Sequence, residues 1–460
     1  MRTPRAAMLA AVSSLALAAA AGAQDSHYWT HQYGTRATLL GGAVIGSVLD
    51  LSGTYYNPGG MCLVEKPETL MAAQVFQLPV VRLSGGGGEA VPLNSGDPRP
   101  APALVAGTIR IRSLPKHWFG YSYVSRQQVR LGVSVSSTGI RDILPDLPGG
   151  EDYVTQFRLE ERVSEQWLGL TWSCRIARNV GVGVSQYLAV RQHRAQAQEL
   201  IELLGGESGL AVALGTRQYK YIHLRTLWKI GLAVDLEGLT LGLTATTPGL
   251  ALGGRGTTGV NSSVVDLDMD GDGDGDDYLA ADYQDGLAAA YRTPFSLAAG
   301  LSFAVRKVRL YTSAEWFARV RPYTVVDAAG FEAQTTGEPL SSDVTQELAP
   351  VLNAGLGAEW FYSPRFKGYA SLTTDRSAKR PGTETNLSLT DWDISHLVVG
   401  AEFFIRKWAL TVGLGYSFGS REIGTRPDIL ERTALETLWD PFDSLRFRYA
   451  SYRLLVGFAI

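Results

Sequence analysis

The chain has 460 residues, a formal net charge of −3 and two cysteines. This near-neutral balance gives no reason to expect a nucleic-acid partner, and two cysteines exclude a disulfide framework. After the N-terminal segment no apolar run approaches the ~18–20 residues that a transmembrane helix needs. Glycine is abundant, with 51 residues, and aromatic residues reach 10%.

The first residues predict a secretory signal peptide over residues 1–23. Arg2 and Arg5 precede an apolar run over 6–20, and Ala21-Gly22-Ala23 supplies small residues for cleavage. The alternative is an uncleaved anchor helix, which this short, alanine-rich run disfavours. We therefore expect an exported protein.

Residues 24–68 lack a strand pattern and are rich in small residues. The stretch "GGAVIGSVLDLSGTYYNPGGM" ends on Asn57-Pro58-Gly59, where proline fixes one φ and glycine permits a positive one. We expect a tight turn there, within a compact segment that precedes the strands.

Period-2 alternation dominates the rest of the chain. One face of a predicted strand is formed by Trp408, Leu410, Val412, Leu414, Tyr416 and Phe418. Many such runs have the ~9–11 residues that cross a bilayer when tilted. A soluble β-sandwich also alternates. Small and polar residues on the second face, and aromatic residues near strand ends, favour a membrane barrel instead.

The connections alternate between short and long. Short turns are expected at 176–179, 236–239, 305–307, 363–365 and 405–407, and long loops at 192–217, 250–285, 327–349 and 420–445. Counting strands between them predicts an all-β, 14-stranded antiparallel transmembrane β-barrel over residues 69–460. The final strand alternates through Tyr452, Leu454, Val456 and Phe458 to Ile460.

The third long loop contains "HRAQAQELIELLGG", residues 193–206. Leu200, Ile201, Leu203 and Leu204 would share one face of a helix. The helix could contact a ligand or simply cap the barrel.

The fourth long loop contains seven aspartates between Asp266 and Asp277. Asp266, Asp268, Asp270, Asp272, Asp274 and Asp277 fit positions 1, 3, 5, 7, 9 and 12 of a calcium loop, with Gly271 at position 6. Position 12 is Asp rather than Glu, and no helices flank the segment, so an EF-hand sensor is excluded. A single structural Ca²⁺ site and a solvated acidic tip remain as alternatives.

Three similar pieces, "AEWF", "AEWF" and "AEFF", place Glu315, Glu359 and Glu402 at equivalent positions. Strand parity directs these carboxylates into the lumen and their aromatic neighbours toward lipid. Because an unpaired buried carboxylate is costly, we expect basic partners, with Arg36 and Lys66 as candidates. Ordinary ion pairs without a gating role are the simpler interpretation.

The glycine-rich stretch before a fourteen-stranded barrel resembles the N-terminal hatch of the FadL/TodX family, and "YRTPFSLAAGLSFAV" at 291–305 resembles one of its strands. The family has Asn-Pro-Ala where this chain has Asn57-Pro58-Gly59. The resemblance implies a bacterial outer-membrane channel for passive uptake of hydrophobic molecules, such as long-chain fatty acids or hydrocarbons. It implies capture by apolar loops, which would include Leu200 to Leu204, then hatch movement and lateral release.

The expected partners are hydrophobic small molecules, outer-membrane lipids and lipopolysaccharide, and the outer-membrane assembly machinery. We expect a monomer without enzymatic activity or an organic cofactor. The alternative function is that of a plugged surface barrel with a structural or adhesive role, stabilised by calcium.

Overall fold

The computed structural model describes residues 26–47, 50–64, 74–84, 89–93, 99–102, 104–109, 111, 113–114, 116–141, 150–205, 209–267, 276–380, 392–405, 408–423 and 445–459. The predicted signal peptide and Lys66 lie outside these residues. No helix in the described part of the chain is long and apolar enough to cross a membrane.

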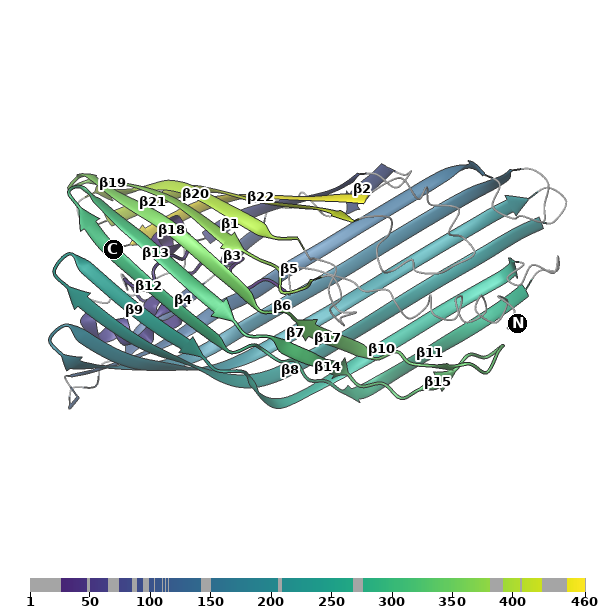
Figure 1. Cartoon of the computed structure of the whole chain (residues 1–460), viewed down its shortest axis with the longest axis horizontal. Helices are drawn as coiled ribbons and strands as arrows, with labels where there is room; N and C mark the ends of the chain where they lie inside the picture. The colour runs from purple at the N-terminus through teal and green to yellow at the C-terminus, as the bar shows by residue number, and fades with distance from the viewer. Residues whose placement is uncertain are drawn as a thin grey trace, which may run out of the picture.

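Antiparallel strands form a closed wall (Figure 1). Its first half contains β1 (Gln74–Ser84), β3 (Arg99–Pro102), β4 (Leu104–Ile109), β5 (His117–Arg141), β6 (Glu151–Ala177), β7 (Val180–Gly205), β8 (Gly209–Leu236) and β9 (Leu239–Thr246). Its second half contains β12 (Ser296–Val305), β13 (Val308–Phe317), β18 (Val351–Ser363), β19 (Phe366–Asp375), β20 (Ile394–Ile405), β21 (Trp408–Ile423) and β22 (Leu445–Ala459).

The order of pairing closes the sheet. Apart from β3 and β4, each wall strand pairs with the next one named, β9 pairs with β12, and β22 pairs with β1. β1 in turn pairs with β3, and β4 pairs with β5. With β3 and β4, which each fill part of the place between β1 and β5, counted as one strand, the described ring has fourteen members. A closed ring leaves no free edge and satisfies the backbone groups internally, as a membrane requires.

One side of the wall is much longer than the other (Figure 1). β5, β6, β7 and β8 have 25, 27, 26 and 28 residues, whereas β12, β13 and β19 have 10 each. Beyond β9, β8 pairs instead with β10 (Leu250–Leu267), and β10 pairs with β11 (Asp276–Ala288). The predicted loops 192–217 and 250–285 are therefore mostly strand, which corrects the loop assignment.

Four smaller strands lie between β13 and β18. β14 (Val320–Val326) pairs with β17 (Val344–Leu348), and β15 (Phe331–Glu332) pairs with β16 (Pro339–Leu340). The remaining strand, β2 (Glu89–Leu93), pairs with the far end of β5.

The two faces of the wall differ as the alternation predicts. Outward-facing leucines such as Leu168, Leu170 and Leu188 are exposed, whereas their inward-facing neighbours are buried. Exposed apolar residues on the outer face of a closed barrel are suited to lipid contact.

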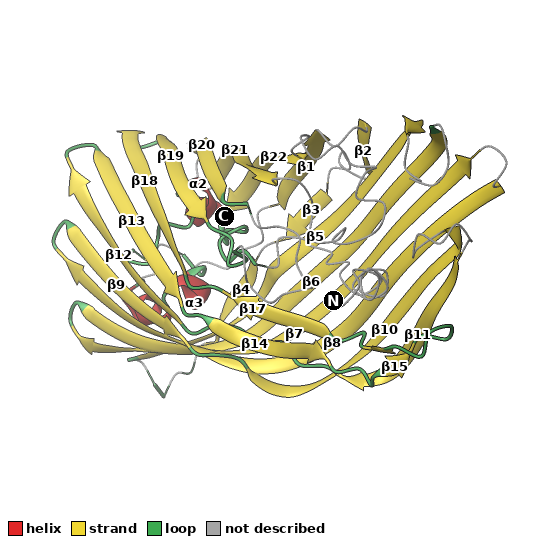
Figure 2. Cartoon of the chain, turned by 45° about the vertical axis from the view of Figure 1, so that its right-hand side comes forward, coloured by secondary structure: helices red, strands yellow, loops and turns green. Residues whose placement is uncertain are grey.

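The N-terminal segment lies inside the ring (Figure 2). It contains α2 (Thr35–Leu39), α3 (Gly53–Tyr56) and the 3₁₀ helix η2 (Pro58–Leu63). We call residues 26–63 the hatch. η2 contacts β6, β7 and β8, and α2 contacts β19 to β22, so the hatch touches opposite sides of the wall.

Candidate functional site

Asp375, at the end of β19, holds the start of the hatch. Its Oδ1 accepts hydrogen bonds from the backbone N–H groups of Tyr28 and Trp29, at 3.0 and 2.8 Å. Its Oδ2 accepts one from Thr30 Oγ1 at 2.7 Å. Since Asp375 is fully buried, these charge-assisted bonds form a strong anchor between wall and hatch.

Glu359 and Glu402 belong to one polar network on the inner wall. Arg36 of α2 forms an ion pair with Glu359, which also accepts a hydrogen bond from Tyr311 at 2.6 Å. Lys367 Nζ lies 3.5 Å from Glu359 and 3.6 Å from Glu402. The structure therefore places Arg36 beside one of the three predicted lumen carboxylates.

Glu315 has neutral donors instead of a basic partner. Trp29 Nε1 of the hatch donates to its Oε2 at 2.8 Å, and Ser296 Oγ donates to its Oε1 at 2.7 Å. Within the described residues Glu315 forms no ion pair like that of Glu359, although Lys229 of the same cavity attracts it at longer range. Hydrogen bonds from indole and hydroxyl groups also satisfy a carboxylate.

Asn57, Pro58 and Gly59 seat the hatch against β7 and β8. Asn57 Nδ2 donates to the carbonyls of Ile45 and Leu232, both at 3.0 Å, and its Oδ1 accepts from Gly59 N–H at 3.1 Å. The side chain thereby caps η2. A Cβ atom on Gly59 would lie 2.5 Å from the carbonyl oxygen of Gly231, so glycine is required for this approach.

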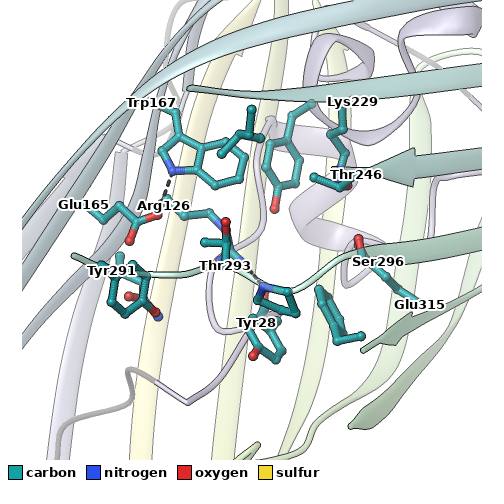
Figure 3. A pocket seen from close by; sticks show the side chains of 15 residues that line it. Tyr28, Arg126, Glu165, Trp167, Lys229, Thr246, Tyr291, Thr293, Ser296 and Glu315 are labelled. Carbon is teal, nitrogen blue, oxygen red and sulfur yellow. Dashed lines mark hydrogen bonds between the residues drawn. The ribbon is translucent and has the colours of Figure 1, made fainter. Parts of the chain in front are cut away.

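An open cavity lies directly beside the hatch (Figure 3); the space between its atoms is about 520 Å³, part of which is open solvent. Its lining mixes aromatic, charged and hydroxyl side chains: Tyr28, Tyr55, Arg126, Gln127, Glu165, Trp167, Leu227, Lys229, Thr246, Tyr291, Thr293, Pro294, Ser296, Glu315 and Phe317. Hatch and wall both contribute, so a ligand in this cavity would touch both.

Lys229 is the cation of this cavity without a conventional partner. Its side chain is buried, and its Nζ lies 4.6 Å from the centre of the Tyr55 ring in the hatch. Within the part of the chain that the structure describes, no acceptor forms a hydrogen bond or an ion pair with this ammonium group. It also lines a second cavity beside Gly41 and Gly42.

A charged cluster on β6 to β8 forms another side of the cavity. Glu165 accepts from Arg191 Nη1 at 2.9 Å, from Arg225 Nη2 at 2.5 Å and from Trp167 Nε1 at 2.7 Å. Both guanidinium groups stack over Tyr291, at 4.0 and 5.0 Å from the ring centre. One carboxylate, Glu165, faces two guanidinium groups, so the cluster keeps a net positive charge beside Lys229.

No role was predicted for Arg225 and Lys229 from the sequence, although both lie on the inward face of β8. Tyr221, His223 and Arg225 follow one another on that face, and Lys229 comes after Leu227. Such a series of polar residues on an inner face indicates a hydrated or ligand-binding lumen.

The predicted capture helix at 193–206 is wrong, because these residues are the end of β7. Ile201 and Leu203 point inward and are buried with Val264, Tyr278 and Leu340, whereas Leu204 is exposed on the other face and Leu200 shares its parity. The four residues therefore do not form one surface. Continuous pairing with β6 and β8 overrides the local helical spacing.

Of the acidic stretch, Asp266 lies near the end of β10, and Asp276 and Asp277 begin β11. Asp266 has a φ of 55°, and its N–H donates to Asp277 Oδ1 at 3.2 Å. Asp268, Asp270, Asp272 and Asp274 lie outside the described residues. Within the described ranges no group of three or more His, Cys, Asp or Glu side chains is arranged to hold a metal.

Burial strongly perturbs the protonation of His31 in the hatch. Burial lowers its pKa to about 3, and the charges of Arg453 and Arg126 act in the same direction. His31 is therefore neutral at physiological pH.

No family model and no curated protein matches the sequence. Solved structures do match. The toluene transporter TbuX of Ralstonia pickettii aligns with a TM-score of 0.56 over 93% of this chain and 98% of its own, at 12% identity. The toluene transporter TodX of P. putida aligns with a TM-score of 0.55 over the same shares, also at 12% identity.

A FadL homologue from Pseudomonas aeruginosa aligns with a TM-score of 0.54 over 94% of this chain and 99% of its own, again at 12% identity. The coverage is nearly complete in both directions, so the likeness extends over most of each chain. The chain therefore has the fold of the FadL- and TodX-type transmembrane barrels, which the glycine-rich N-terminal stretch resembles.

Proposed function

We propose that this protein is a bacterial outer-membrane channel for the passive uptake of hydrophobic molecules, and that those with an anionic head, such as fatty acids, are its preferred substrates. The carrying observation is the excess of basic groups at and beside the open cavity, where Arg126, Lys229, Arg191 and Arg225 face only the carboxylates of Glu165 and Glu315, and Lys229 has no hydrogen-bond or ion-pair acceptor among the described residues. A buried charge without a partner is costly. A carboxylate in the cavity would remove that cost, whereas toluene or another neutral hydrocarbon would not.

Lys229 also connects the ligand to the hatch. Its contact with Tyr55 joins β8 to α3 through a cation–π interaction. A carboxylate that draws the ammonium group away from this ring would weaken one contact between wall and hatch. Binding would thus favour the hatch movement that uptake needs.

The apolar residues that a hydrophobic substrate would meet first lie at the other end of the lumen. Ile201 and Leu203, with their buried neighbours on β10, β11 and β16, offer a first apolar contact at the long-strand end. We further propose that the substrate leaves sideways through the wall, because a hydrophobic tail then avoids the aqueous mouth.

Lys229→Met tests this function against the matched change Lys307→Met in an exposed turn. Uptake of radiolabelled laurate and of toluene is measured in cells that lack other uptake channels. We expect Lys229→Met to reduce laurate uptake more than tenfold with toluene unchanged, and Lys307→Met to reduce neither. Equal laurate uptake in all three proteins would refute the anionic preference. Uptake of neither compound by the wild type would favour the plugged, structural barrel.

Calcium binding by the aspartates at 266–277 stays a prediction. Extracellular sites of this kind have dissociation constants of about 10⁻⁴–10⁻³ M, which suits a structural clasp. Millimolar calcium should protect 255–285 from protease in purified protein free of lipopolysaccharide, and Asp268→Asn/Asp270→Asn should abolish this protection. If calcium changes neither cleavage nor melting, the segment is a solvated acidic tip.

A further inference from the structure

A straight row of four basic residues crosses the outer face of the extended wall. The strand register pairs Arg130 of β5 with Arg162 of β6, Arg162 with Arg194 of β7, and Arg194 with Lys220 of β8. All four side chains are exposed. We call these residues the basic row; their strands lie side by side in Figure 1.

The basic row is electrostatically unfavourable by itself. Directly opposite residues on neighbouring strands have Cβ atoms about 4.5–5.5 Å apart, and like charges at such positions destabilise a sheet. None of the four has a hydrogen-bond or ion-pair partner among the described residues. The nearest carboxylate by register, Glu160, is hydrogen-bonded to Arg158 at 2.5 Å and attracts Arg162 and Arg130 only at longer range. A bound anion would relieve the repulsion.

The residues around the basic row indicate which kind of anion it binds. On β8 the next outward residues toward the short turns are Ile222 and Leu224, directly after Lys220. On β6 two polar residues separate Arg162 from Leu168, which is 59% exposed. The basic row therefore follows the boundary between the apolar, lipid-facing surface and the polar surface beyond it.

We propose that the basic row binds the phosphate groups of a phosphorylated lipid in the surrounding leaflet. In an outer membrane this lipid is lipopolysaccharide. Only an amphiphile covers both surfaces at once, with phosphates against the guanidinium groups and acyl chains against the leucines. Arginine suits this role because its planar fork donates two parallel hydrogen bonds to a phosphate. The inference is independent of the substrate that the lumen carries.

The test uses purified full-length protein and bis-phosphorylated lipid A, with binding measured by native mass spectrometry and by titration. The variant is Arg162→Gln/Arg194→Gln. The control, Arg178→Gln/Lys307→Gln, removes the same charge from exposed turns at the opposite end. Heat-modified gel migration checks that each barrel is folded.

We expect the variant to bind lipid A at least tenfold more weakly, since each basic residue near a lipid surface contributes roughly fivefold. The control should bind like the wild type. Equal binding by variant and wild type would overturn the proposal. Competition by millimolar inorganic phosphate would also overturn it, because the row would then hold free anions.

A second measurement needs no variant. Wild-type protein should bind dephosphorylated lipid A at least tenfold more weakly than the bis-phosphorylated form. Equal binding of the two forms would show that only the acyl chains are recognised, and would refute the assignment even if the double variant does not fold.

Discussion

The hatch contacts the wall through individual buried side chains. Because a buried polar group needs a partner, each of these contacts joins two particular groups. The cost of a buried carboxylate predicted a cation near Glu359, and Arg36 is found there. The same argument did not predict Trp29 beside Glu315 or the three donors at Asp375. Strand parity gives the direction of a side chain, but only the folded hatch determines which donor lies opposite.

Asp375 should be essential for seating the start of the hatch. Asp375→Asn keeps the size of the side chain but removes its charge, and hydrogen bonds to charged groups contribute about 1.5–3 kcal/mol. We expect hatch docking to weaken by about that amount, seen as faster proteolysis near residue 30 and higher conductance. Asp235→Asn, at an exposed position near the end of β8, serves as the control. Equal proteolysis in both variants would contradict the anchor.

His31 should make hatch docking depend on pH. Its pKa is about 3 when the hatch is docked and about 6.5 in a solvated segment. Below pH 6.5 the released hatch binds a proton that the docked hatch does not, so docking weakens as pH falls. Above pH 6.5 the protonation of His31 does not weaken docking. Between pH 6.5 and pH 3 the free energy of docking becomes less favourable by up to about 1.4 kcal/mol per pH unit.

Conductance in planar bilayers measures this dependence. We expect wild-type openings to become more frequent between pH 7 and pH 5, and His31→Asn to flatten the change. His117→Asn, on β5 at the short-turn end, should retain the wild-type profile. Asp375, His396, Arg126 and Arg453 also act on His31. If His31→Asn keeps the pH response, one of these neighbouring groups causes it.

At the scale of elements, the short strands and turns were predictable and the long strands were not. The turns between β8 and β9, β12 and β13, and β18 and β19 occur where the sequence places them. The end of β7 was taken for a loop with a helix because Leu200, Ile201, Leu203 and Leu204 have helical spacing. The pairing of β7 with β8, which depends on residues outside this stretch, instead continues to Gly205.

The parity of β7 gives a direct test of capture at the long-strand end. Ile201 points into the buried apolar cluster and Leu204 points away from it, with 59% of its surface exposed. We expect Ile201→Asp to reduce uptake of a hydrophobic substrate more than fivefold at equal surface expression. Leu204→Asp should stay within twofold of wild type. Equal losses in the two variants would indicate general damage to β7 rather than loss of an apolar contact.

For the whole molecule, alternation and turn spacing predict an antiparallel barrel because a bilayer permits few other all-β solutions. They do not predict how the hatch fills it. The hatch is a chain of short helices with many small residues, and its path depends on wall atoms far away in sequence. Asn57, for example, meets the carbonyl of Leu232 and packs beside Gly231.

The contact at Gly231 allows the hatch to be displaced without being removed. A Cβ atom there would lie 2.3 Å from Asn57 Oδ1 and 2.8 Å from Gly59 N, whereas one on Gly368 would meet nothing within 4 Å. We expect Gly231→Val to raise conductance in planar bilayers, Gly368→Val to leave it unchanged, and deletion of 28–60 to raise it most. The barrel should still fold after the deletion because its strands pair with one another. Unchanged conductance after the deletion would mean that the hatch is not the barrier. If the deletion variant conducts and Gly231→Val does not, the contact that holds the hatch in place lies elsewhere on the wall.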